Sequence, residues 1–379
     1  MQYSTFAAID IGSYDVILEI FEISKKQGIR SVDKICHRME LGKDTYTLGK
    51  IRPEMEEELC RVLADFVRIM EGYRVDDYRA TASSAISEAS NSLYVLGKIH
   101  QLTGFSVTVL SNSEQRFLSY KALAAMEDNF NKIIEKGTAI LDLDGGSFQI
   151  SLFDKDALVT TQNIRMGSLR IRERLAGIQS ETEHYEEMVE ELIWNEVSSF
   201  KKMYLKDRKI ENIMLIGDVF TDSVYQNIEE KTTKIISREN FNTWYEKIIR
   251  QSPMELAVKL GIPLENASLM YPSAVIYKCL IDMMGAEHIW IPGVHMTRGI
   301  AYEYAEQMKL LKGGHNFEND ILMAAKNIGK RYAVNRPHVQ NLEMTALAMF
   351  DATKKMHGMK ERERLLLQMA VMLHDVGKY

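Results

Sequence analysis

One pattern occurs twice in this chain of 379 residues. Residues 8–18 read AIDIGSYDVIL, and residues 139–152 read AILDLDGGSFQISL. Each stretch is an apolar strand, an Asp, a turn of small residues and a second apolar strand, which predicts a β-hairpin. The likeness has two explanations, an internal duplication or a coincidence between two buried hairpins. A duplication predicts two similar halves whose turns face one cleft.

Strands and helices are expected to alternate around the two hairpins. The first half predicts a helix over residues 53–73, because Pro53 and the glutamates after it suit a first helical turn. A strand over 77–82, a helix over 84–102, a strand over 106–110 and a helix over 113–126 follow. The second half predicts helices over 181–204, 241–261 and 267–284, with strands over 212–217 and 289–291. This alternation is typical of α/β proteins.

The length exceeds what one ordinary core holds and predicts several domains. We expect α/β domains over residues 1–126 and 127–312. Beyond residue 301 the pattern is wholly helical, and the pair Gly313-Gly314 marks a boundary before a helical segment over 313–379.

Composition excludes several classes of protein. With 47 basic and 53 acidic residues the formal charge is -6, so no global field attracts nucleic acid or an anionic membrane. No apolar run approaches the roughly 20 residues of a spanning helix, and the first residues do not resemble a secretion signal. Three scattered cysteines exclude a disulfide framework. We expect a soluble cytoplasmic protein. Its one local basic patch, over residues 201–209, is either a solvated helix end or a polyphosphate-binding track.

The two turns carry groups that could bind phosphate and metal. Backbone N–H groups and a hydroxyl at the turn after Asp10, and again at the turn after Asp142, would form small anion-binding concavities. The two aspartates could hold a magnesium ion directly or through water. The alternative is that both are ordinary hairpin turns.

Five segments, in order and spacing, resemble the exopolyphosphatase / guanosine pentaphosphate phosphohydrolase (Ppx/GppA) family. They are FAAIDIGSYDVIL (6–18), RATASSAISEASN (79–91), VTVLSNSEQRFLSYKAL (107–123), TAILDLDGGSFQISLF (138–153) and IRMGSLRIRERL (164–175). The resemblance implies duplicated ribonuclease-H-like (actin-like) halves with the active cleft between them. It also implies a partial all-helical HD-like C-terminal domain, in a chain truncated relative to the family.

The departures from the family pattern fall on positions that carry chemistry. Tyr14 lies where the first turn of the family has a small polar residue, and Ser87 lies where the family has a phosphate-binding arginine. Gln115 replaces the glutamate that the resemblance assigns as general base, and Gln149 replaces a second acidic residue. A Gly-Gly-Thr turn of the family becomes Gly-Asp at Asp218.

The resemblance assigns roles residue by residue. Asp10 and Asp142 would hold Mg²⁺, and the catalytic positions would be Glu114, Gln115 and Gln149, with Gln115 orienting the attacking water. Phosphates would be bound at the glycine turns by Gly12, Ser13, Gly145, Gly146, Ser147, Gly167 and Ser168.

Two functions follow from these assignments. The first is hydrolysis of terminal phosphoanhydrides of inorganic polyphosphate or guanosine pentaphosphate, weakened because glutamine is no base at neutral pH. The second is a non-catalytic sensor or scaffold that keeps the ligand without the reaction. A third hypothesis is a sugar or acetate kinase with the same fold. A homodimer is compatible with the sequence.

The C-terminal segment carries a second candidate metal site. His338 and the His374-Asp375 pair have the ligand types of a histidine–aspartate domain. A further Asp of metal-dependent members is absent from this sequence. We therefore expect these residues to serve helical packing.

Overall fold

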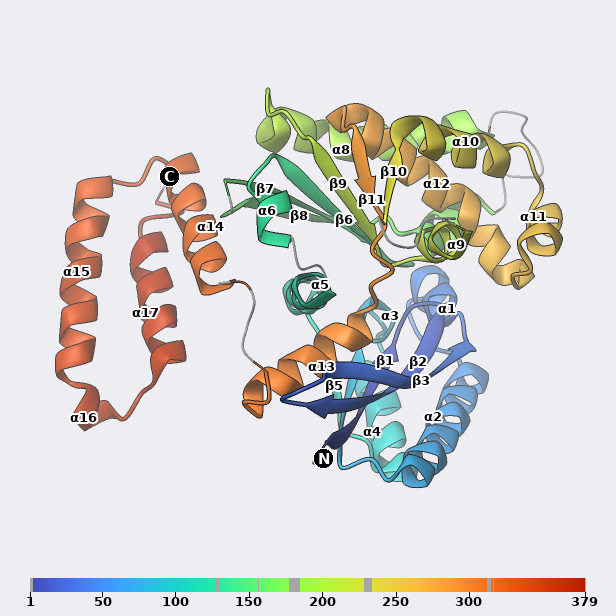
Figure 1. The fold of residues 1–379 in the computed structure, drawn as a ribbon, viewed down its shortest axis with the longest axis horizontal. Coiled ribbons are helices and arrows are strands. Elements are labelled where there is room, and N and C mark those ends of the chain that lie inside the picture. The colour runs from blue at the N-terminus through green and yellow to red at the C-terminus, as the bar shows by residue number, and fades with distance from the viewer. Residues whose placement is uncertain are drawn as a thin grey trace.

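The computed structural model describes residues 3–126, 130–155, 157–176, 185–227, 234–311, 315 and 317–378. Two mixed β-sheets, each flanked by helices, form two lobes, and a group of helices lies to one side of them (Figure 1). The predicted α/β class, with two sheet-containing halves and a helical C-terminal segment, is confirmed.

The first lobe has five strands in the order β3-β2-β1-β4-β5. Strands β1 to β3 are antiparallel, and β4 and β5 continue the sheet in parallel with β1. The strands are β1 (Ser4–Ile11), β2 (Asp15–Ser24), β3 (Gly28–Arg38), β4 (Asp77–Ala82) and β5 (Val107–Val109). Helices α1 (Leu41–Leu48), α2 (Pro53–Tyr73), α3 (Ser84–Ser87) and α4 (Ser92–Thr103) accompany them.

The second lobe has six strands in the order β10-β11-β9-β6-β7-β8. They are β6 (Thr138–Leu143), β7 (Phe148–Asp154), β8 (Ala157–Ile164), β9 (Asn212–Ile216), β10 (Ile235–Ser237) and β11 (His288–Trp290). The unit β8-β7-β6-β9 has the order and directions of β3-β2-β1-β4 in the first lobe. The shared unit supports the duplication and excludes a coincidence confined to the two hairpins.

The helices of the second lobe fill the space around this sheet. They are α6 (Phe130–Ile134), α7 (Ser168–Leu175), α8 (Tyr185–Phe200), the π-helix η1 (Lys201–Leu205), α9 (Val219–Asn227), α10 (Arg238–Ile249), α11 (Pro253–Leu260) and α12 (Leu264–Met284). Among them α12 is buried on nearly every side.

Two helices lie where the lobes meet, α5 (Asn112–Met126) and α13 (Met296–Gln307) (Figure 1). Helix α13 follows the second sheet in sequence but packs on the first, where Tyr304 stacks on Phe6 with ring centroids 4.1 Å apart. Gly299 allows α13 to approach α5, since a Cβ there would lie 2.1 Å from the Leu118 carbonyl oxygen. The chain therefore returns to the first sheet before it leaves the lobes. The division at residues 126 and 312 stays a prediction.

Two expected helices are divided in the structure. The expected helix over 84–102 is interrupted between α3 and α4, where the Asn91 side chain accepts a hydrogen bond from the Ile51 N–H and donates one to the Ile51 carbonyl. The expected helix over 241–261 breaks before Pro253, where Ser252 and Glu255 form a capping box. Asn91 thus ties the break to the segment before α2, whereas Ser252 binds the Glu255 N–H of the helix that it begins.

The C-terminal helices form a small cluster of their own, visible at one side of Figure 1. They are α14 (Phe317–Arg331), α15 (Arg336–Ala352), α16 (Lys354–His357) and α17 (Glu361–Leu373), packed around Ala325, Val339 and Met372. The expected boundary at Gly313-Gly314 and the start of the helix expected from residue 181 lie outside the described residues. In the described ranges no helix is both long enough and apolar enough to cross a bilayer.

Candidate active site

A cavity of about 170 Å³ lies between the lobes, and we call it the acidic cavity. The structure brings five predicted residues together on its wall. They come from β1, the turn after it, α5, β6 and β7, and are Asp10, Gly12, Gln115, Asp142 and Gln149. Asp10 pairs with Ile17 in the first hairpin and Asp142 with Gln149 in the second, so the two hairpins present equivalent positions to one space.

Carboxylates dominate the acidic cavity. Burial raises the pKa of Asp10 well above its usual value, and the charges of Asp15, Asp144 and Asp142 raise it further. Burial likewise raises the pKa of Asp142 to about 6 and that of Asp144 to about 7. The raised pKa values mean that these carboxyls hold protons more readily than exposed aspartates, chiefly because burial disfavours their charged form.

Three basic side chains also line the cavity, Lys34, Arg38 and His295. Arg38 is committed to Asp15, with Nη1 3.0 Å from Oδ2. Burial lowers the pKa of His295, so its imidazole is neutral at neutral pH. Because carboxylates outnumber basic side chains in its lining, the cavity is suited to bind a cation and repels an anion that comes without one.

The two glutamines are buried at the cavity wall. Gln115 lies in the first turn of α5, and Gln149 lies at the start of β7. The Gln149 side-chain oxygen has no hydrogen-bond partner among the described residues. A buried acceptor without a partner costs folding free energy, on the order of 1–3 kcal/mol, unless a water or cation satisfies it.

Gly217 closes the cavity beside the second aspartate. Its φ of 102° suits glycine, and a Cβ there would lie 2.6 Å from the Asp142 Oδ1. The adjacent Asp218 points away into the core, where Tyr277 donates a hydrogen bond to its Oδ1 at 3.3 Å. Burial raises the pKa of Asp218 to about 7. Asp218, which replaces a glycine of the family's turn, is therefore a buried acid that does not line the cavity.

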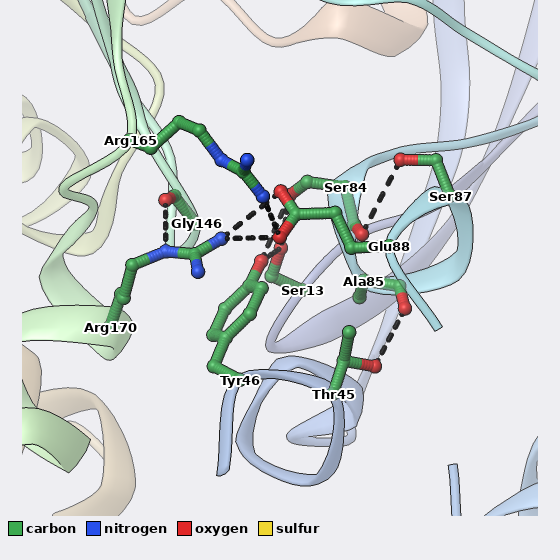
Figure 2. A network of polar contacts seen from close by, with 10 residues as sticks. All are labelled: Ser13, Thr45, Tyr46, Ser84, Ala85, Ser87, Glu88, Gly146, Arg165 and Arg170. Atoms are coloured by element: carbon green, nitrogen blue, oxygen red, sulfur yellow. Dashed lines mark hydrogen bonds and ion pairs between the residues drawn. The ribbon is translucent and has the colours of Figure 1, made fainter. Parts of the chain in front are cut away.

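The two glycine turns touch each other directly. Gly145 packs against Ser13, and a Cβ on Gly146 would lie 2.1 Å from the Tyr46 hydroxyl oxygen. Ser13, Tyr46 and Ser84 join their hydroxyls in a triangle with oxygen separations of 2.7, 2.8 and 3.3 Å (Figure 2). The Ser13 hydroxyl, which the sequence assigns to phosphate, is therefore hydrogen-bonded to two neighbouring hydroxyls.

An ion-pair clasp joins the lobes next to these hydroxyls, as Figure 2 shows. Glu88 of the first lobe binds Arg170 at 3.0 Å and Arg165 at 2.5 Å, both from the second lobe. Arg170 is held in place because its Nε donates to the Gly146 carbonyl at 2.8 Å and its guanidinium lies 3.9 Å from the centre of the Tyr46 ring. Charge and stacking therefore fix the second glycine turn against the first lobe.

Other predicted residues lie outside the acidic cavity. Gly167 packs behind the second turn, where a Cβ would lie 2.2 Å from the Asp144 carbonyl oxygen. Ser168 donates its N–H to that same oxygen at 3.3 Å. Ser147 is buried and absent from the lining. Glu114 is exposed, and it accepts hydrogen bonds from the Ser111 N–H and hydroxyl at the start of α5.

Tyr46, Glu88, Arg165 and Arg170 were not expected at the site. The two arginines lie on either side of the segment Met-Gly-Ser at 166–168, and this segment is the one sequence feature that could have drawn attention to them. Tyr46 lies on α1, a helix that the sequence analysis did not predict. Only the folded arrangement of the lobes brings these side chains to the turns.

The C-terminal histidines do come together. Among the described residues one trio of His, Cys, Asp or Glu has its ligand atoms within 4.8 Å of one another, namely His338, His374 and Asp375. The His374 Nδ1 lies 2.7 Å from the Val371 carbonyl oxygen, and its Nε2 lies 3.1 Å from the Asp375 Oδ1. The packing role that the sequence favours stays a prediction.

Comparison with known proteins yields relatives of low identity. A bifunctional 3-dehydroquinate synthase/phosphatase of Fusobacterium nucleatum is 21% identical over 310 residues, covering 75% of this chain and 44% of that protein. A guanosine-5'-triphosphate,3'-diphosphate pyrophosphatase of Vibrio atlanticus is 19% identical over 379 residues, covering 98% of this chain and 72% of that protein. The chain thus spans less than half of the first relative.

Solved structures show the same fold. An exopolyphosphatase from Cytophaga hutchinsonii matches with a TM-score of 0.72 at 17% identity, covering 80% of this chain and 98% of that chain. A Ppx/GppA family member from Aquifex aeolicus matches with a TM-score of 0.65 at 17% identity, covering 81% and 99%. The model of the Ppx/GppA phosphatase family matches residues 19–308. Two lobes around a shared acidic cavity, together with this match over most of the sequence, show that the chain belongs to the Ppx/GppA phosphatase family.

Proposed function

We propose that this protein removes terminal phosphate from inorganic polyphosphate or a guanosine polyphosphate at the acidic cavity, with magnesium as the cofactor. One observation carries the proposal: Asp10 and Asp142, from equivalent hairpins of the two lobes, line one cavity with Gln115 and Gln149. A cavity of about 170 Å³ has room for the end of a phosphate chain and not for its length, which supports attack on a terminal phosphoanhydride.

The donor set fits a magnesium ion. Asp10, Asp142 and Asp144 offer hard carboxylate oxygens, and the unpartnered Gln149 oxygen is a further buried acceptor. Mg²⁺ commonly takes only one or two carboxylates and keeps several waters. When bound, the ion would neutralise charge on the transferring phosphoryl group.

The residues of the chain then have distinct tasks. Asp10 and Asp142 hold the cation and thereby admit an anion that five nearby carboxylates would otherwise repel. Gln115 orients a water through its amide, since positioning contributes a large share of phosphoryl-transfer catalysis. With no ionised base at this position, the reaction is slower by roughly the 10²–10⁴-fold that general bases supply.

Phosphate binding at the glycine turns requires a change in the hydroxyl triangle. Ser13, Tyr46 and Ser84 satisfy one another in the structure and leave no space for a Cβ on Gly146. A phosphate at this place would take over those hydroxyls as donors while the lobes separate. Gly12 lines the cavity, but its N–H donates to the Asp15 carbonyl oxygen at 2.9 Å and would also have to exchange that partner for a phosphate.

The second candidate is a non-catalytic binder of the same ligands. Two features favour it. The Ser13 hydroxyl is bound to other hydroxyls and not free for a phosphate, and the two glutamines lack the proton acceptor that catalysis would use. A cytoplasmic location stays a prediction for either function.

Phosphate release from polyphosphate with and without magnesium decides between the two. The proposed hydrolase releases phosphate in a magnesium-dependent way, and Asp142→Asn abolishes it. Binding of polyphosphate without release in either condition would favour the sensor. Release that is unchanged in Asp142→Asn would place the reaction elsewhere.

A further inference from the structure

A second and larger cavity lies away from the acidic one, between the edge strand β8, the π-helix η1 and helix α14. Its volume is about 760 Å³, and we call it the basic cavity. Asn327 holds α14 against the strand, since its amide donates to the Leu158 and Val159 carbonyls at 3.3 and 3.2 Å. The wall thus combines the second sheet with the C-terminal helices.

Cations line the basic cavity, and no carboxylate does among the described residues of its wall. The four are Lys206, Arg208, Lys330 and Arg331, all exposed, in a chain whose formal charge is -6. The nearest ion pair is a loose one, with Arg208 Nη1 3.7 Å from the Asp154 Oδ2. Within the described ranges Lys206 and Lys330 form no ion pair. Four cationic side chains around one cavity produce a local positive potential, although the net charge of the chain is negative.

The rest of the wall is apolar and aromatic. Ile328 and Tyr332 are exposed at 42% and 43%, and Val159 and Val376 add aliphatic surface. The Arg331 guanidinium lies 4.7 Å from the centre of the Tyr204 ring and 5.8 Å from that of Tyr332. A ligand that fills this space would meet both cationic groups and apolar or aromatic surface.

We propose that the basic cavity binds a nucleoside polyphosphate, with its phosphates on the lysines and arginines and its base against the tyrosine side. An inorganic phosphate chain has no apolar part to cover Ile328 and Tyr332, whereas a nucleotide has both parts. The volume lies in the range of small-molecule sites. The nucleotide would bridge β8 and α14, and this site goes beyond the reaction proposed for the acidic cavity.

Calorimetric titration of the full chain in EDTA tests the proposal. Without divalent cations the acidic cavity repels anions, so adenosine or guanosine triphosphate reports on the basic cavity. We expect Lys206→Ala with Lys330→Ala to weaken nucleotide binding at least tenfold. The matched control is Lys202→Ala with Lys326→Ala, which removes two exposed charges from the same two helical regions outside the lining and should leave the affinity within twofold.

Tyr332→Ala and tripolyphosphate test the class of ligand. We expect Tyr332→Ala to weaken nucleotide binding several-fold and to leave tripolyphosphate binding unchanged. Equal losses in the lining pair and the control pair would show a diffuse charge effect and overturn the site. Tripolyphosphate that binds as tightly as the nucleotide would overturn the nucleotide assignment, and no binding in EDTA would overturn both. Phosphate release with magnesium is scored separately, so the two proposals can fail independently.

Discussion

The Gly146 backbone lies so close to Tyr46 that a Cβ on the glycine would come within 2.1 Å of the tyrosine hydroxyl oxygen. The Ser84 hydroxyl oxygen would be 2.4 Å from the same Cβ. These contacts cross from the second lobe to the first. The second glycine turn therefore forms part of the contact between the two lobes.

Gly146→Ala should destabilise the protein by about 1–3 kcal/mol, because the methyl group has to displace buried hydroxyls. The measurement is the free energy of unfolding in urea. Gly97→Ala is the matched control, since Gly97 lies in helix α4 with no heavy atom within 4 Å of a new Cβ. That variant should gain up to about 1 kcal/mol from helix propensity. Equal stability of the two variants would show that the lobes do not meet at Gly146.

Glu88→Gln should loosen the second glycine turn selectively. The change removes the charge that Arg170 and Arg165 share, while the Arg170 Nε keeps the Gly146 carbonyl. We expect amide hydrogen exchange at Gly145 and Gly146 to accelerate several-fold.

Glu40→Gln is the comparison for this prediction. Glu40 pairs with Arg172 at 2.7 Å, also between the lobes, but Arg172 does not contact the turn. The two variants should lose similar stability and differ in exchange at the turn. Equal hydrogen exchange at the turn in the two variants would mean that Glu88 stabilises the contact between the lobes without any specific effect on the turn.

The sequence predicted the hairpins, the duplication and the convergence of Asp10 with Asp142, because each depends on local patterns that repeat. It did not predict that the turns touch, because Tyr46, Glu88 and Arg170 meet only after the lobes pack. Glu114 illustrates the same limit. A motif position beside Gln115 indicated catalysis, and the structure uses its carboxylate to cap α5.

Stability should fall as pH rises from about 4 to about 8. In the folded state the pKa is raised to about 6 for Asp142 and to about 7 for Asp144 and Asp218. Unfolded aspartates have pKa values of about 3.9, so the folded protein binds more protons across this range and loses stability as they leave. At about 1.4 kcal/mol per pKa unit the three shifts correspond to at most about 11 kcal/mol, and the fall is measurable by urea unfolding at several pH values.

Magnesium should reverse part of this loss, and only at high pH. The ion binds the ionised carboxylates, so we expect magnesium chloride to raise the melting temperature at pH 8 and to leave it unchanged at pH 5. Asp142→Asn should remove most of the magnesium effect. A magnesium effect of equal size at both pH values would point to a site other than the acidic cavity.

Gln115→Glu together with Gln149→Glu should raise phosphate release by one to a few factors of ten, within the roughly 10²–10⁴-fold range of general-base catalysis. Both side chains line the acidic cavity, so the change places a proton acceptor where a water could be activated. Burial and the neighbouring carboxylates will raise the pKa of the new acids, as they raise that of Asp144. The gain should therefore grow from pH 7 to pH 9, with magnesium present.

The phosphate release of this double variant distinguishes the loss of a proton acceptor from the loss of transition-state contacts. A rise that grows with pH would identify a site disabled at its proton acceptor. No rise with polyphosphate binding intact would contradict this prediction and mean that transition-state contacts are missing as well, since a restored base cannot replace the guanidinium that Ser87 lacks. The single variants distinguish the two positions: Gln115→Glu alone should account for most of the rise if it is the residue that faces the water.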